Sequence, residues 1–201
     1  MRRSITVVPL LFLCLATLAS TVLSPTAFAA PAAAPEVQNA PTAIPTITPT
    51  PVPADPVRLV IPSIKLDRSL VSVGLDKNRI PIVPDHDIGW YNLSAKPGQG
   101  ENVVLWGHVL RFRQTPKIPA PFADLKKAKV GAVVTLYDAN GVQYDYTITQ
   151  QIWVKPDQVE YILPIGSERI TMVSCIGDKV VRGREVIEMT HRLITIAEPV
   201  R

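Results

Sequence analysis

Short strand-like segments separated by turn residues recur throughout residues 56–201 and restrict the fold to the all-β class. Apolar and β-branched runs bounded by Gly, Pro, Asn or Asp are typical of strands in a barrel or a sandwich. The predicted strands are residues 58–60, 70–73, 80–83, 102–108, 132–137, 143–153, 169–175 and 193–197. Phe122–Ala128 alone resembles a helix, and a short one. The pattern therefore predicts one β-domain that begins near Pro56.

The segment before this domain has a different composition. Ten of the 20 prolines fall within residues 25–62, and residues 31–55 are rich in Ala, Pro and Thr with almost no charge. Such a segment cannot bury enough apolar surface to offset its ordering entropy, so we predict an extended linker over 31–55.

Residues 1–30 have the pattern of an export signal. Arg2 and Arg3 precede an apolar run, and Ala27-Phe-Ala29 fits a cleavage site between small residues. The run is also about long enough to span a bilayer, so a cleaved signal peptide and an uncleaved anchor both remain open. Either one places the β-domain outside the cytoplasm, membrane-anchored or secreted at the cell surface.

The charge of the chain excludes some functions. The formal net charge is +4, and removal of Arg2 and Arg3 leaves +2 (4 − 2), which is too weak to indicate nucleic-acid binding. Asp85-His86-Asp87 has no second cluster that would complete a set of metal ligands, so we interpret it as a turn and predict neither metal nor cofactor.

Cysteine usage leaves two interpretations of Cys175. Cys14 lies in the apolar leader, so the exported part has one cysteine and cannot form an internal disulfide. Cys175 is then either a small buried side chain, which cysteine counts alone favour, or a reactive thiol. It lies at the end of predicted strand 169–175, where Gly177-Asp178 predicts a loop.

Two further residues at predicted strand ends complement a thiol nucleophile. A thiol reacts as its thiolate and needs a nearby base or cation. His108 ends strand 102–108 beside Gly107, which we expect to permit a tight turn, and Arg192 begins the last strand. Singly, a loop histidine and a surface arginine are common structural residues. Together with Cys175 at strand ends, where loops carry sites, they predict an acyl-transfer centre.

In combination these segments resemble the sortases, cysteine transpeptidases of bacterial surfaces. The resemblance covers nearly all of residues 56–201, in order. The matching segments are Ile61-Pro-Ser-Ile-Lys65, Gly89-Trp-Tyr91, Pro97-Gly98, Gly107-His108, Phe122-Ala-Asp-Leu125, Val130-Gly131, Thr171-Met-Val-Ser-Cys175 and Arg192-Leu-Ile-Thr-Ile-Ala197. Met172 and Ser174 depart from the family's T-L-x-T-C motif, and the early landmarks look closest to classes D, E and F.

The resemblance implies a fold and a reaction. The fold would be a closed eight-stranded β-barrel with one or two short helices. Cys175 would be the nucleophile, His108 the general acid and base, and Arg192 the oxyanion donor, with Thr171 and Ser174 contacting the substrate. The substrates would be surface proteins with a C-terminal sorting signal, L-P-x-T-G or L-A-x-T-G, cleaved between Thr and Gly. The acyl group would pass to an amine of a cell-wall precursor or a pilin lysine, without a cofactor.

Two alternatives belong to other classes. The first is a non-catalytic extracellular β-barrel that binds peptides or envelope polymer, in which Cys175 would resist thiol-directed labelling in the native state. The second is an L,D-transpeptidase, but that family places its His and Cys close together in an S-H-G-C-like segment, which this sequence lacks.

Overall fold

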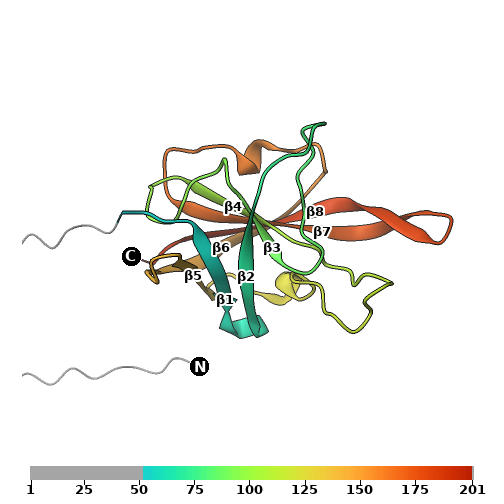
Figure 1. Ribbon diagram of the computed structural model, residues 1–201, viewed down its shortest axis with the longest axis horizontal. Coiled ribbons are helices and arrows are strands. Elements are labelled where there is room, and N and C mark those ends of the chain that lie inside the picture. Colours follow the sequence, from blue (N-terminus) through green and yellow to red (C-terminus); the bar gives the residue numbers. More distant parts are fainter. Residues whose placement is uncertain (1–51, 201) are drawn as a thin grey trace, which may run out of the picture. The chain divides into compact units, whose positions relative to one another are not determined.

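Eight strands close into a single barrel in the computed structural model, which describes residues 52–200 (Figure 1). This confirms the predicted fold class. The strands are β1 (Pro56–Ile61), β2 (Leu66–Val73), β3 (Ile88–Tyr91), β4 (Asn102–Trp106), β5 (Val133–Asp138), β6 (Gln143–Val154), β7 (Arg169–Arg182) and β8 (Glu185–Pro199). Their order around the barrel is β1-β2-β3-β4-β7-β8-β6-β5. The β2–β3 and β4–β7 pairs are parallel, and the other pairs are antiparallel.

The barrel has apolar side chains on both sides of its wall near β4. Successive side chains of a strand point to opposite faces. Val103 and Leu105 belong to the cluster that fills the barrel, whereas Val104 and Trp106 pack in a second cluster on the outside. All five residues of β4 are therefore buried, which explains why this strand is a continuous apolar run.

The predicted strand 80–83 is wrong. Ile80 and Ile82 are exposed, and the segment contributes only an isolated bridge between Leu75 and Pro81. Pro81 has no amide hydrogen to donate to a neighbouring strand. The strand in this part of the barrel is β3, which pairs with β2 from Leu70↔Ile88 to Val73↔Tyr91.

Helical structure in the described residues is limited to three 3₁₀ turns. They are η1 (Pro62–Ile64), η2 (Leu125–Lys127) and η3 (Glu160–Ile162). The predicted helix 122–128 is thus reduced to η2, whose last turn closes through the Ala128 amide to the Leu125 carbonyl at 3.1 Å. Among residues 52–200 no helix is long and apolar enough to cross a membrane. The predicted leader and most of the linker fall in residues 1–51, outside the described residues.

Strands β7 and β8 extend beyond the barrel as a projecting hairpin (Figure 1). The loop predicted at Gly177-Asp178 is absent because Gly177, at φ +91°, forms a bulge in a strand that continues to Arg182. The Asp178 amide donates to Thr190 Oγ1 at 2.9 Å across this bulge. The hairpin turns at Gly183-Arg184, where Gly183 has φ +63°. A two-residue turn with glycine first is typical of type II′ hairpins.

Candidate active site

The register of β4 on β7 brings His108 beside Cys175. These parallel strands pair from Asn102↔Arg169 to Trp106↔Val173, and the Gly107 amide continues the pairing to the Val173 carbonyl at 3.3 Å. Two residues further on, the same register places 108 next to 175. His108 and Cys175 each come two positions after an outward-facing residue, Trp106 and Val173 respectively, so both side chains lie on the outer face of the barrel.

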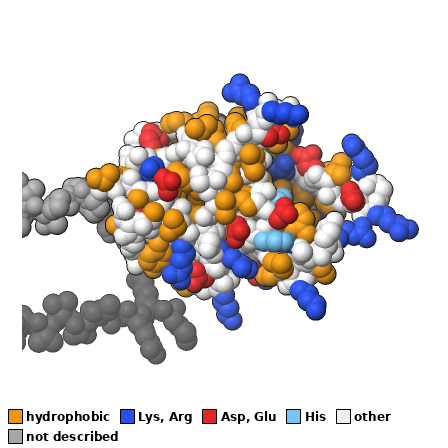
Figure 2. Space-filling model, in the orientation of Figure 1, with side chains coloured by type: hydrophobic (Ala, Val, Ile, Leu, Met, Phe, Trp, Pro, Cys, Tyr) orange, Lys and Arg blue, Asp and Glu red, His pale blue; other side chains and the backbone are white. Residues whose placement is uncertain are grey.

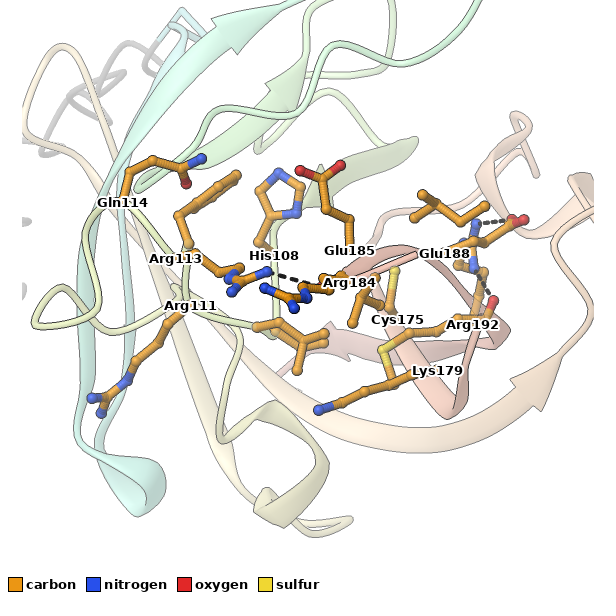
Figure 3. Close-up of a pocket in the computed structure, with 16 residues that line it drawn as sticks. His108, Arg111, Arg113, Gln114, Cys175, Lys179, Arg184, Glu185, Glu188 and Arg192 are labelled. Carbon is orange, nitrogen blue, oxygen red and sulfur yellow. Dashed lines mark hydrogen bonds and ion pairs between the residues drawn. The ribbon is translucent and has the colours of Figure 1, made fainter. Parts of the chain in front are cut away.

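Arg192 lies on β8, on the side of Cys175 opposite to His108. Cys175 and Arg192 are direct partners in the antiparallel β7–β8 pair, and directly opposed side chains share a face. His108, Cys175 and Arg192 all line one groove of about 660 Å³. Figure 3 shows the three side chains around this groove, with the sulfur between the imidazole and the guanidinium. The three residues that we predicted from strand ends are therefore brought together.

The backbone of His108 is held by the segment that precedes η2. The Phe122 amide donates to the His108 carbonyl at 2.9 Å. A Cβ atom at Gly107 would lie 3.0 Å from Phe122 Cδ2 and 3.2 Å from Pro121 Cγ. Gly107 is not in the positive-φ region, so our expectation of a tight turn is wrong. A side chain at position 107 would press on Phe122, which packs directly against the backbone beside His108.

The His108 ring is half-buried among side chains of two loops. It packs edge-to-face on Phe112, at 5.0 Å between ring centroids, and His86 also packs edge-to-face on Phe112, at 5.5 Å. Burial lowers the pKa of His108 below its ordinary value. The Asp85 carboxylate and a hydrogen bond with the Val83 backbone act in the opposite direction on this pKa, without reversing it.

Arg192 is fixed by the hairpin and by one carboxylate. Its Nη1 donates to the Met189 carbonyl at 3.0 Å and to the His191 carbonyl at 3.3 Å, and its Nη2 donates to Glu188 Oε1 at 3.0 Å. A guanidinium carries five N–H donors. The Nε–H and one Nη2–H therefore have no partner among the described residues.

Cys175 carries a free, half-buried thiol. Burial raises the pKa of this thiol, the Arg192 charge lowers it, and the Glu188 charge raises it. Glu188 was not predicted from the sequence. It precedes Arg192 by four residues on β8, so the two side chains lie on the same face of the strand. This relation can be recognised only when the hairpin is known to continue as a strand.

Thr171 and Ser174, which we expected to contact a substrate, do not line the groove. Thr171 is fully buried, and its hydroxyl donates to Asn102 Oδ1 at 2.8 Å. Ser174 is 3% exposed and lies on the inner face of β7, where its Oγ has no hydrogen-bond partner.

The groove has the chemistry of an acyl-transfer site. It combines a nucleophilic sulfur, an imidazole that can carry a proton, and a cation that can stabilise an oxyanion. Within residues 52–200, no group of three or more His, Cys, Asp or Glu side chains is arranged to hold a metal ion.

Both a protein-family model and a curated relative that resemble this chain are sortases. Residues 59–200 match the model of the Sortase domain family. Sortase A of Bacillus anthracis is 28% identical over 123 residues, which span 61% of this chain and 52% of that protein. The match thus covers about half the length of that relative.

Solved structures show the same fold. Sortase C1 of Streptococcus agalactiae is 27% identical, with a TM-score of 0.54 over 72% of this chain and 67% of that chain. Sortase A of Corynebacterium diphtheriae is 20% identical, with a TM-score of 0.56 over 75% of this chain and 62% of that chain.

Proposed function

The chain belongs to the sortase family, and from this premise we propose that it is a cysteine transpeptidase whose active site consists of Cys175, His108 and Arg192. Its donor substrates are surface proteins with a C-terminal sorting signal of the L-P-x-T-G or L-A-x-T-G type. The acceptor is an amine of a cell-wall precursor or a pilin lysine. The observation that carries the proposal is the alignment of the three side chains along one groove on β4, β7 and β8.

The first half-reaction forms a thioester. The Cys175 proton passes to His108, and the thiolate attacks the carbonyl carbon of the Thr residue. The two free N–H donors of Arg192 stabilise the oxyanion, an effect of about 10²–10³-fold for a single donor. His108 then protonates the Gly nitrogen as the C–N bond breaks, and the Gly-containing fragment leaves as an amine.

The second half-reaction reverses these steps with a new amine. The acceptor nitrogen attacks the thioester carbon, His108 accepts the proton that the nitrogen loses, and the C–S bond breaks to release Cys175. Water in place of the amine gives hydrolysis.

Before substrate binds, the Cys175 thiol and the His108 imidazole are mainly uncharged. The pKa of Cys175 is raised and that of His108 is lowered, so thiol and imidazole predominate over thiolate and imidazolium. The reactive ion pair is a minor form that the Arg192 charge favours.

Trapping of the acyl-enzyme tests the proposal. Wild-type protein incubated with L-P-x-T-G and L-A-x-T-G peptides should gain the mass of the acyl fragment on Cys175. Cys175→Ala should gain none, and His108→Ala and Arg192→Met should form the adduct at least about 10²-fold more slowly. His191→Ala is the matched control, because His191 neighbours Arg192 in sequence but does not line the groove.

The outcome also separates the non-catalytic alternative. Peptide binding without an adduct, together with a Cys175 that reacts with iodoacetamide only after denaturation, would establish a binding barrel and refute the transpeptidase.

The class within the family and the membrane attachment are finer parts of the proposal. The early landmarks resemble classes D, E and F, whereas the relatives named above are sortases A and C. A clear preference for L-A-x-T-G over L-P-x-T-G peptides would support class E. Sequencing of the mature N-terminus would distinguish export with cleavage near Ala30 from permanent anchoring through residues 1–30.

A further inference from the structure

The groove at the candidate active site has an excess of positive charge. Its lining includes five cationic side chains and two carboxylates. Arg192 and Glu188 pair with one another, which leaves four cations and a single carboxylate, that of Glu185. The four cations are Arg111, Arg113, Lys179 and Arg184.

These four side chains have no acidic partner among the described residues, where the ion pairs all involve other cations. All four are exposed. Basic side chains project at the hairpin end of the molecule in Figure 2, on the right of the view. An unpaired cluster of this kind attracts anions in proportion to its charge and loses that attraction in salt.

Two of the cations lie on the histidine side of the sulfur. His108 contacts Phe112, and the next residue, Arg113, donates from Nη1 to the Arg184 carbonyl at 3.0 Å. This bond links the loop after β4 to the hairpin turn. Figure 3 shows Arg113 and Arg184 toward His108, where Glu185 also lies, whereas Arg192 and Glu188 lie beyond Cys175 in the other direction.

The histidine side is where amines leave and arrive in the proposed reaction. His108 protonates the departing nitrogen and accepts the proton of the incoming one, so both nitrogens must come within hydrogen-bond reach of the imidazole. Glu185 offsets one of the two arginine charges there, so a protonated amine that carries no anion still meets a net positive charge that repels it. A carboxylate near the amine offsets this repulsion and gives the cations a partner.

We propose that Arg113 and Arg184 select an acceptor amine that carries a carboxylate close to the reacting nitrogen. This inference rests on the proposed transpeptidase function and names the chemical class of its second substrate.

Competition between two acceptors tests the inference. Glycyl-glutamate amide and glycyl-glutamine amide differ only in the side-chain charge, and both are offered in equal amounts to the acyl-enzyme. The glutamate product should exceed the glutamine product by about threefold to tenfold at low salt, as expected for one or two exposed ion pairs. The ratio should approach one at about 0.5 M salt, where the Debye length is short.

Variants identify the residues responsible. Arg184→Gln should reduce the ratio, and Arg113→Gln/Arg184→Gln should bring it close to one. Arg182→Gln is the matched control, since Arg182 is exposed on the same hairpin but does not line the groove, and it should keep the wild-type ratio. A wild-type ratio of one at low salt, with acyl-enzyme present, would overturn the inference and leave the transpeptidase intact.

A second measurement does not depend on turnover. Iodoacetate and iodoacetamide alkylate the same sulfur, but only iodoacetate is anionic. Relative to N-acetylcysteine amide, Cys175 should favour iodoacetate by about threefold to tenfold, and the Arg113→Gln/Arg184→Gln protein should lose most of this preference. An unchanged preference in that protein would refute the assignment of these arginines, whether or not an acyl-enzyme forms.

Discussion

Replacement of Asn102 by alanine should destabilise the barrel by breaking a buried hydrogen-bond junction. Asn102 is 3% exposed and begins β4. Its Nδ2 donates to the carbonyls of Tyr161 and Leu163, both at 3.0 Å, and its Oδ1 accepts from Thr171 Oγ1 at 2.8 Å and from Arg169 Nε at 3.3 Å. One side chain thus joins β4, β7 and the connection that contains η3.

The cost follows from the partners that alanine would leave unpaired. The Tyr161 carbonyl keeps its bond from Arg169 Nη2 at 2.8 Å, so the Leu163 carbonyl, the Arg169 Nε–H and the Thr171 hydroxyl lose their side-chain partner. Leu163 is exposed and Arg169 is only partly buried, so water can replace Asn102 there, whereas Thr171 is fully buried. A buried polar group without a partner costs about 1–3 kcal/mol. We therefore expect Asn102→Ala to lower the free energy of unfolding by about 1–3 kcal/mol, and the melting temperature by roughly 2–12 °C.

Urea and thermal unfolding measure this loss, and a double-mutant cycle identifies its origin. Thr171→Val removes the hydroxyl that Asn102 accepts from, so the cost of the double variant should fall below the sum of the single costs by about 1 kcal/mol. A loss below about 1 kcal/mol in Asn102→Ala, or strict additivity with Thr171→Val, would show that the junction does not stabilise the barrel.

Three other perturbations address the site. Glu188→Gln should lower the pKa of Cys175 and Arg192→Met should raise it, and the pH dependence of iodoacetamide alkylation measures both; equal pKa values in all three proteins would contradict the charge assignments. The pKa of His108 is lowered and that of Cys175 is raised, so kcat/KM plotted against pH should be a broad bell that rises through the His108 pKa and falls through the Cys175 pKa. A kcat/KM profile that only rises or only falls with pH would contradict the sharing of one proton between the two side chains. Gly177→Ala should destabilise the hairpin by about 1–3 kcal/mol, because φ is +91° there and a Cβ has no space, and unchanged urea unfolding would refute this.

Sequence reasoning predicted the groove's chemistry because that chemistry depends on residue type. Cys175, His108 and Arg192 are recognisable as a nucleophile, a base and an oxyanion donor before any fold is known. Their positions at the ends of predicted strands, combined with the ordered motifs, were sufficient to predict that they meet, although Cys175 lies within β7 and Arg192 within β8. The structure places them along one groove.

The hairpin was missed because a glycine in a β-protein can either form a bulge within a strand or begin a loop. Gly177 in the left-handed region forms a bulge here, but the same residue pair also starts loops. The pairing of β7 with β8 distinguishes the two cases, and that pairing is a long-range property. Glu188 was missed as a consequence, since its alternation with Arg192 exists only if β8 begins before it.

The failed strand prediction has a different cause. Ile80 and Ile82 alternate with other residues as they would in a half-buried strand, but both are exposed. Pro81 separates them and cannot donate to a ladder. The segment makes two antiparallel hydrogen bonds, from the Asp76 amide to the Ile80 carbonyl at 2.8 Å and from the Ile82 amide to the Gly74 carbonyl at 3.1 Å, but its pairing extends no further than this one bridge.

The order of strands around the barrel makes β8 the element on which closure depends. β8 lies between β7 and β6, and it is the last strand of the chain. The strand that seals the cylinder is thus also the one that supplies the guanidinium. Until the C-terminal residues have docked, a nascent or truncated chain lacks the guanidinium that our proposal assigns to the oxyanion, beside a sulfur and an imidazole that are already in place.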